Sequence, residues 1–314
     1  MKGLEIAEKY YLEYGAPMLA EQFPELEGIV AAGLVGSGSE CLGYDDEISR
    51  DHDFEPGFVL FLPPEEVVDR SLAFKLERAY AKLPTDFMGL TRNRDVSFET
   101  GRHGVVRAAD FFRAKVGDPD GDLSLDKWLT IPEHYLLEVT DGKIFRDDLG
   151  IVTDVRKKLA YFPEDVRLKK LAGALMLAEQ AAGYNYERVL SRGDTAAAQL
   201  AIGEYVREVL SVIFLLARRY KPFYKWQFRA LDEIETFAPL REDLESLLST
   251  GNGAGESIEK LSRIRRINAA LGEEIRAQGL SDYDGLRLDS FAYCVNGKIK
   301  DPSLRNMHVM AGAE

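Results

Sequence analysis

The chain has 314 residues, of which 46% are hydrophobic and 30% are charged, proportions that are ordinary for a globular protein. Its net charge of −13 argues against an extended nucleic-acid surface, which needs a basic footprint, although a local basic groove is compatible with it. The only two cysteines, Cys41 and Cys294, form no disulfide framework. No signal peptide and no apolar run of membrane length stand out, so we expect a cytoplasmic protein without a membrane partner.

The first half of the chain has the pattern of an α/β module. Helical periodicity over residues 4–23 predicts a packing helix that leads into a first strand at 28–35. A glycine turn then separates this strand from a second apolar run. The remaining elements expected in this half are a strand at 59–62, a helix from 63 to about 83, paired strands at 96–100 and 104–109, and a helix at 128–139.

The glycine turn after the first strand has the composition of a phosphate cradle. Glycine lets backbone N–H groups approach an anion without obstruction by a Cβ atom, and serine adds a hydroxyl donor. Two overlapping pairs fit the spacing equally well, Gly36 with Ser37 and Gly38 with Ser39. Either pair is a candidate for binding the phosphates of a nucleotide.

Two carboxylates, Asp51 and Asp53, precede the second apolar run. Residues i and i+2 of a strand point to one face, roughly 7 Å apart, so both carboxylates can converge on one or two divalent cations. The pair alone is a weak signal, because the acidic chain repeats the Asp-x-Asp pattern and a solvated acidic loop is the ordinary explanation. The other occurrences are Asp118/Asp120, Asp120/Asp122 and Asp282/Asp284.

Three segments carry a family resemblance: GLVGSGSECLGYDDEISRDHDF from Gly33, GYNYERVLSRGD from Gly183 and RRYKPFYKW from Arg218. They are similar to the DUF4037 family within the nucleotidyltransferase (DNA polymerase β-like) superfamily. The resemblance implies transfer of a nucleoside monophosphate from an NTP, with ATP the first expectation, to an unknown acceptor. That acceptor is a hydroxyl of a small molecule or a protein side chain. Asp51 and Asp53 would then bind Mg²⁺ or Mn²⁺ as catalytic residues.

The superfamily pattern also has a third carboxylate, on a later strand, which acts as general base or metal ligand. Glu99, between Phe98 and Thr100, fits it best, and Asp110 and Glu138 fit it less well. His103 is a second candidate for the base or for acceptor contact. A lone strand carboxylate is commonly just exposed. Without a third acid, the chain would be a catalytically inactive nucleotide-binding or interaction protein with the same fold.

From about residue 151 the pattern is helical without competing strand alternation. The helices expected are 165–183, 196–219, 225–237, 240–248 and 258–277. We therefore expect an α+β protein: a nucleotidyltransferase-like mixed sheet with helices in residues 1–150, followed by an all-α helical bundle in residues 151–314.

Two segments of the expected bundle combine cations with aromatic residues. Arg188 and Arg192 are four residues apart, the spacing of one helical face, and Lys225 lies among aromatic residues in the segment from Arg218. Composition alone favours solvated basic helix ends. Because the resemblance covers both segments, we interpret these three cations as a wall that holds the triphosphate while an aromatic ring stacks on the base.

Overall fold

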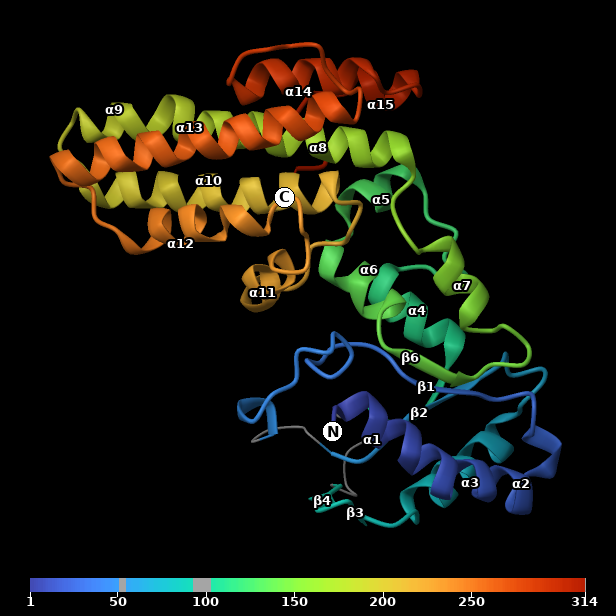
Figure 1. Cartoon of the computed structure of the whole chain (residues 1–314). Helices are drawn as coiled ribbons and strands as arrows, with labels where there is room; N and C mark the ends of the chain where they lie inside the picture. Colours follow the sequence, from blue (N-terminus) through green and yellow to red (C-terminus); the bar gives the residue numbers. More distant parts are fainter. Residues whose placement is uncertain (51–54, 93–102, 314) are drawn as a thin grey trace. The chain divides into compact units, whose positions relative to one another are not determined.

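The computed structural model describes residues 1–50, 55–92 and 103–313 (Figure 1). It confirms the α+β class: a four-stranded mixed sheet with helices lies in the first half, and the second half is mostly helical. The chain forms two compact units. The sheet unit is Met1–Leu123 with Tyr135–Ala160, and the helical unit is Ser124–His134 with Tyr161–Glu314. The domain boundary expected at residue 150 stays a prediction.

The sheet has the strand order β5-β2-β1-β6. Its strands are β1 (Ala31–Leu34), β2 (Val59–Leu62), β5 (Gly104–Arg107) and β6 (Lys143–Arg146). β1 is antiparallel to both β2 and β6, whereas β2 is parallel to β5. Every residue of β1 and β2 is buried, because short apolar runs of this kind are covered on both faces.

This topology brings four chain connections to one edge of the sheet. The last residue of β1, Leu34, pairs with the first residue of β6. The first residue of β2, Val59, pairs with Gly33 on one side and with Gly104, the first residue of β5, on the other. The chain therefore leaves β1 at the same edge at which it enters β2, β5 and β6.

The expected N-terminal helix is continuous but contains a wider turn. It consists of α1 (Gly3–Tyr10), the π-helix η1 (Tyr11–Gly15) and α2 (Ala16–Gln22). It packs closely over the start of β2, because a Cβ atom on Gly15 would lie 2.4 Å from the Phe58 ring. Its buried residues share one core with β1, β2 and α3 (Arg70–Ala81).

Two helices differ from the sequence expectation. The helix expected from residue 63 begins at Arg70, because the Asp69 side chain caps it by accepting from the Leu72 amide at 2.8 Å. The helix expected at 128–139 is interrupted at Pro132 and forms α5 (Leu125–Thr130) and α6 (Glu133–Thr140). β5 pairs in parallel with β2, and residues 96–100, its expected hairpin partner, lie outside the described ranges.

Smaller elements complete the sheet unit. They are η2 (Pro24–Leu26), η3 (Ile48–Arg50), β3 (Asp86–Phe87), β4 (Leu90–Thr91), α4 (Ala108–Val116) and α7 (Thr153–Lys158). β3 and β4 form a separate antiparallel pair.

The helical unit is built around two long antiparallel segments. The first is α8 (Glu164–Ala178), which continues through the π-helix η4 (Glu179–Tyr186) into α9 (Glu187–Leu190); the second is α10 (Thr195–Leu216). The helices that follow are η5 (Tyr224–Trp226), α11 (Gln227–Leu231), η6 (Ala238–Leu240), α12 (Arg241–Ser249), α13 (Ala254–Ala277), α14 (Leu288–Gly297) and α15 (Pro302–Asn306). Within the described ranges, no helix has the length and apolar character needed to span a membrane.

Candidate functional site

The Gly-Ser turn begins immediately beyond β1, at the sheet edge where the four connections meet. Gly36 has φ +114° and Gly38 has φ +142°, a region that residues with a Cβ atom rarely adopt. Ser37 is exposed and Ser39 half-buried. The Ser39 carbonyl accepts a hydrogen bond from the Tyr44 amide at 2.7 Å, which closes the turn behind the two serines. The glycines are therefore required by backbone shape, whatever the turn binds.

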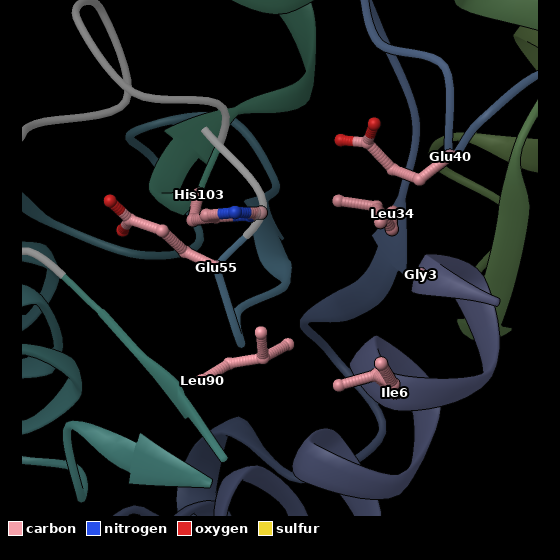
Figure 2. Close-up of a pocket in the computed structure, with 7 residues that line it drawn as sticks. All are labelled: Gly3, Ile6, Leu34, Glu40, Glu55, Leu90 and His103. Atoms are coloured by element: carbon pink, nitrogen blue, oxygen red, sulfur yellow. The ribbon is translucent and has the colours of Figure 1, made fainter. Parts of the chain in front are cut away.

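A small pocket lies at this same edge (Figure 2). Its volume is about 10 Å³, and its lining residues are Gly3, Ile6, Leu34, Glu40, Glu55, Leu90 and His103. Glu40 follows the Gly-Ser turn, Glu55 precedes β2 and His103 precedes β5. In the view of Figure 2, Glu40 and His103 approach from opposite sides, and the Glu55 carboxylate is turned away from them. The pocket thus lies among three of the connections.

His103 is held tightly against the chain that leads into β2. A Cβ atom on Gly57 would lie 2.5 Å from the His103 ring, so only glycine leaves room for the imidazole at this position. The backbone of the next residue, Phe58, is fixed by Tyr80, whose hydroxyl accepts from the Phe58 amide at 3.2 Å and donates to its carbonyl at 2.8 Å. Burial raises the pKa of Tyr80 to about 12, so the phenol remains protonated as this donor.

The three predicted catalytic residues, Asp51, Asp53 and Glu99, lie outside the described ranges and stay predictions. In sequence, Asp51 and Asp53 are followed by Glu55 before β2, and Glu99 is followed by His103 before β5. Both Glu55 and His103 line the pocket. In the part of the chain that the structure describes, no group of three or more His, Cys, Asp and Glu residues is placed to hold a metal ion.

Two acids of the loop after the Gly-Ser turn have structural partners. Asp45 is buried, accepts from the Gly3 amide at 3.0 Å and lies 3.6 Å from the Lys2 ammonium, so it stabilises the N-terminus of α1. Asp46 accepts from the amides of Ile48 and Ser49, both at 3.0 Å, and from the Ser49 hydroxyl. These contacts fold the loop between the turn and residue 50.

The three cations predicted to hold phosphates are exposed but do not form one cluster. The Arg188 guanidinium lies 4.6 Å from the Tyr184 ring centroid, and Arg192 lies in the turn after α9. The Lys225 ammonium lies 5.1 Å from the Trp226 ring centroid, within η5. α10 separates the two segments in sequence and spans about 33 Å. Figure 1 shows α9 and α11, which directly follows η5, at separate places along the helical unit.

Lys225 lies within an exposed aromatic surface. The preceding rings of Phe223 and Tyr224 have centroids 4.5 Å apart, and these side chains are 44% and 73% exposed. Exposed aromatic faces beside a cation suit a planar, anionic ligand such as a nucleotide. Of the two cationic segments, this one has the more complete chemistry for binding a base and a phosphate together.

Sequence reasoning missed Glu40 and Glu55 as residues of the site. Both adjoin segments that the sequence predicts to form the site, since Glu40 follows Ser39 and Glu55 lies two residues after Asp53. Their positions next to the glycine turn and the acid pair were a usable signal. Their place in one pocket depends on the pairing of β1, β2 and β5, which the sequence pattern does not specify.

Comparison with known proteins gives a match between part of the chain and a family of domains of unknown function. Residues 128–227 match the family described as DUF4037, from α5 to the start of α11. This range contains Arg188, Arg192 and Lys225. No curated protein and no solved structure matches the chain.

Proposed function

We propose that the chain is a metal-dependent nucleotidyltransferase of the DNA polymerase β-like superfamily. It would transfer a nucleoside monophosphate from an NTP, with ATP as the first candidate donor, to a hydroxyl or side-chain acceptor. The observation that carries the proposal is the shared sheet edge. The Gly-Ser turn after β1, the segment before β2 and the segment before β5 all open there.

The Gly-Ser turn supports the part of the proposal that concerns phosphate. With Gly36 and Gly38 at positive φ, backbone amides and serine hydroxyls stand beyond the end of β1 without Cβ atoms in the way. A nucleotide's phosphate oxygens need donors of this kind. The turn is also closed on its far side by the Ser39–Tyr44 hydrogen bond, so its shape does not depend on a ligand.

The metal would be held by Asp51 and Asp53, whose segment leads into β2 through Glu55. Bound Mg²⁺ or Mn²⁺ supplies charge neutralisation on the phosphates. Carboxylates before β2 and amides after β1 would meet the same triphosphate because both adjoin one edge.

The reaction needs a base for the acceptor. The acceptor oxygen attacks the α-phosphorus, the bond from that phosphorus to the bridging oxygen breaks, and pyrophosphate leaves with the electron pair. The acceptor's proton passes to Glu99 or to His103. His103 lines the pocket at this edge together with Glu40, which supports its imidazole as a candidate for this proton transfer.

Nucleotide binding tests the site directly. ATP, GTP, CTP and UTP are each added with and without Mg²⁺. Only the preferred donor should raise the melting temperature of the protein, and only when metal is present. At a ligand concentration 100 times Kd, the gain is about 2.7 kcal/mol, or several degrees. Asp51→Asn/Asp53→Asn should remove this shift. The matched control is Asp282→Asn/Asp284→Asn, which changes the same pattern at two exposed residues.

Transfer of label then separates catalysis from binding alone. The preferred NTP, labelled at the α-phosphate, should label an acceptor in a cell extract with wild type and not with the Asp51/Asp53 variant. Metal-dependent binding without label transfer, across extracts and candidate hydroxyl compounds, would favour the inactive nucleotide-binding protein. Absence of a melting shift with every NTP at millimolar concentration would overturn the proposal.

A further inference from the structure

Two successive lysines of α8, Lys169 and Lys170, are buried in the helical unit with exposures of 0% and 2%. Their chemistry is unusual, because a buried ammonium ordinarily pairs with a carboxylate. In the described part of the chain, both ammonium groups hydrogen-bond only to neutral oxygens. Burial lowers the pKa of Lys169.

Each lysine has one partner in the helices and one in the C-terminal segment, residues 307–313. The Lys169 ammonium donates to the Asn296 side-chain oxygen at 3.0 Å and to the Met307 carbonyl at 2.8 Å. The Lys170 ammonium donates to the carbonyls of Leu129 and Gly312, at 3.2 and 3.1 Å. The segment is thus fastened at two points, five residues apart, by the two lysines.

Small residues let the C-terminal segment lie close to the helices. Gly312 has φ +82°, and a Cβ atom there would lie 2.7 Å from the Leu129 side chain. A Cβ atom on Gly173 of α8 would lie 2.9 Å from the Ala313 Cβ atom. The segment covers the part of α8 that carries the two lysines.

Neutral carbonyls are weak partners for two buried positive charges. A charged acceptor forms shorter and roughly twice as strong hydrogen bonds with an ammonium. An anion that replaced the segment would neutralise both lysines while the Asn296 and Leu129 oxygens stayed in place. Both ammonium groups contact the C-terminal segment, at the carbonyls of Met307 and Gly312, so one extended anion in its place can contact both.

We propose that Lys169 and Lys170 form a binding site for a polyphosphate anion, which the C-terminal segment covers when the anion is absent. Polyphosphate fits better than a single carboxylate because it offers several charged oxygens to two ammonium groups. The Phe162 ring, 5.5 Å from the Lys170 ammonium, forms an apolar wall of the same site. The proposal does not depend on the Gly-Ser turn or the acid pair, since all of its residues belong to the helical unit.

Calorimetric titration with inorganic pyrophosphate tests the site. The titration is made in EDTA on Asp51→Asn/Asp53→Asn protein, so that the proposed metal-dependent site does not contribute. In this background, Gly312→Val opposes the positive φ and the close contact with Leu129, and therefore displaces the segment without altering the helices. We expect it to tighten pyrophosphate binding about tenfold, because the covered state no longer competes. Gly297→Ala, at a glycine with open space around it, should bind as the parent does.

Replacing the lysines provides the complementary result. Lys169→Met/Lys170→Met, added to Gly312→Val, should weaken pyrophosphate binding about tenfold or more, because two charged donors are lost. The single variants Lys169→Met and Lys170→Met serve if the double variant does not fold. Retention of full affinity in the folded lysine variants would overturn the proposal, as would equal affinity of the Gly312→Val protein and its parent.

Hydrogen exchange in the C-terminal segment gives a test without helical-unit substitutions. In the Asp51→Asn/Asp53→Asn protein, saturating pyrophosphate should speed exchange over residues 307–313, whereas unchanged exchange would contradict displacement. Tripolyphosphate and metal-free ATP are then compared. Similar affinities identify the phosphate chain as the recognised group, and much tighter ATP binding shows that the anion is a nucleotide's triphosphate. Binding of ATP but of neither inorganic anion would overturn the polyphosphate assignment.

Discussion

In the sheet unit, the acidic residues near the candidate site lie in loops and bind backbone amides. Asp45 and Asp46 both accept hydrogen bonds from amide N–H groups. In the helical unit, lysine and arginine residues of the helices lie in two different environments. Lys169 and Lys170 are buried there against carbonyl oxygens, whereas Arg188 and Lys225 are exposed. Proximity to a motif therefore does not show that a charged residue is functional. A position in an ordinary helical pattern does not show that a charged residue is exposed to solvent.

The two units also use glycine differently. At the sheet edge, glycines permit turns and close passage of backbone, as at Gly36 and Gly142. In the helical unit, Gly173 permits a segment from elsewhere in the chain to lie on α8. Substitutions at glycines with and without close neighbouring atoms can therefore measure how closely each unit is packed around them.

The largest effect is expected for Gly142→Ala at the sheet edge. Gly142 has φ +78°, and a Cβ atom would lie 2.3 Å from the Leu34 carbonyl oxygen at the end of β1. Strain and overpacking together should cost about 3 kcal/mol of unfolding free energy, measured by urea denaturation. Gly43→Ala is the control, because Gly43 has φ +70° with open space around it. It should cost about 1 kcal/mol, and equal losses would show that β1 does not approach Gly142 closely.

A smaller, pH-dependent effect is expected in the helical unit at Glu164. Hydrogen bonds from Arg167 and Arg218 lower the pKa of this carboxyl to about 2. A lowered pKa contributes stability above the ordinary pKa near 4.5, and that contribution is lost as the pH falls towards 2. Glu164→Gln should therefore destabilise the protein at pH 7 by about 1.5 kcal/mol, since the carboxylate is half-exposed.

The difference between wild type and Glu164→Gln should shrink as urea denaturation is repeated at pH 5, 4 and 3. Glu235→Gln, at an exposed residue, is the matched control and should track wild type at each pH. A difference that stays constant with pH would contradict the role assigned to the two arginines.

The sequence was sufficient for the fold class and for many elements. The apolar run 59–62 is β2, and the helical periodicity of 4–23 is a continuous helical segment. It did not specify that β5 pairs in parallel with β2, because strand partners depend on contacts distant in sequence. The same limit hid the pocket of Glu40, Glu55 and His103, whose members come from three connections.

The buried lysines show the limit of pattern reasoning more sharply. Lys169 and Lys170 occur in a helical segment where long charged side chains ordinarily reach solvent. Their burial depends on carbonyl oxygens of Leu129, Met307 and Gly312, which are 41 to 142 residues away in sequence. Local sequence spacing does not indicate such distant partners. Only the fold of the C-terminal segment identifies the two lysines as candidate anion-binding residues.

The smallest expected effect is a difference in stability between alanine substitutions at two glycines, both within long helices of the helical unit. Gly203 in α10 has open space around an added Cβ atom, so Gly203→Ala should stabilise the protein by about 1 kcal/mol, the ordinary gain of alanine over glycine in a helix. Gly173→Ala makes the same change in α8, but there the added methyl meets Ala313. Its helix gain should be offset by displacement of the C-terminal segment. Thermal denaturation of both variants compares them directly, and an equal gain at the two positions would mean that the segment does not rest on α8.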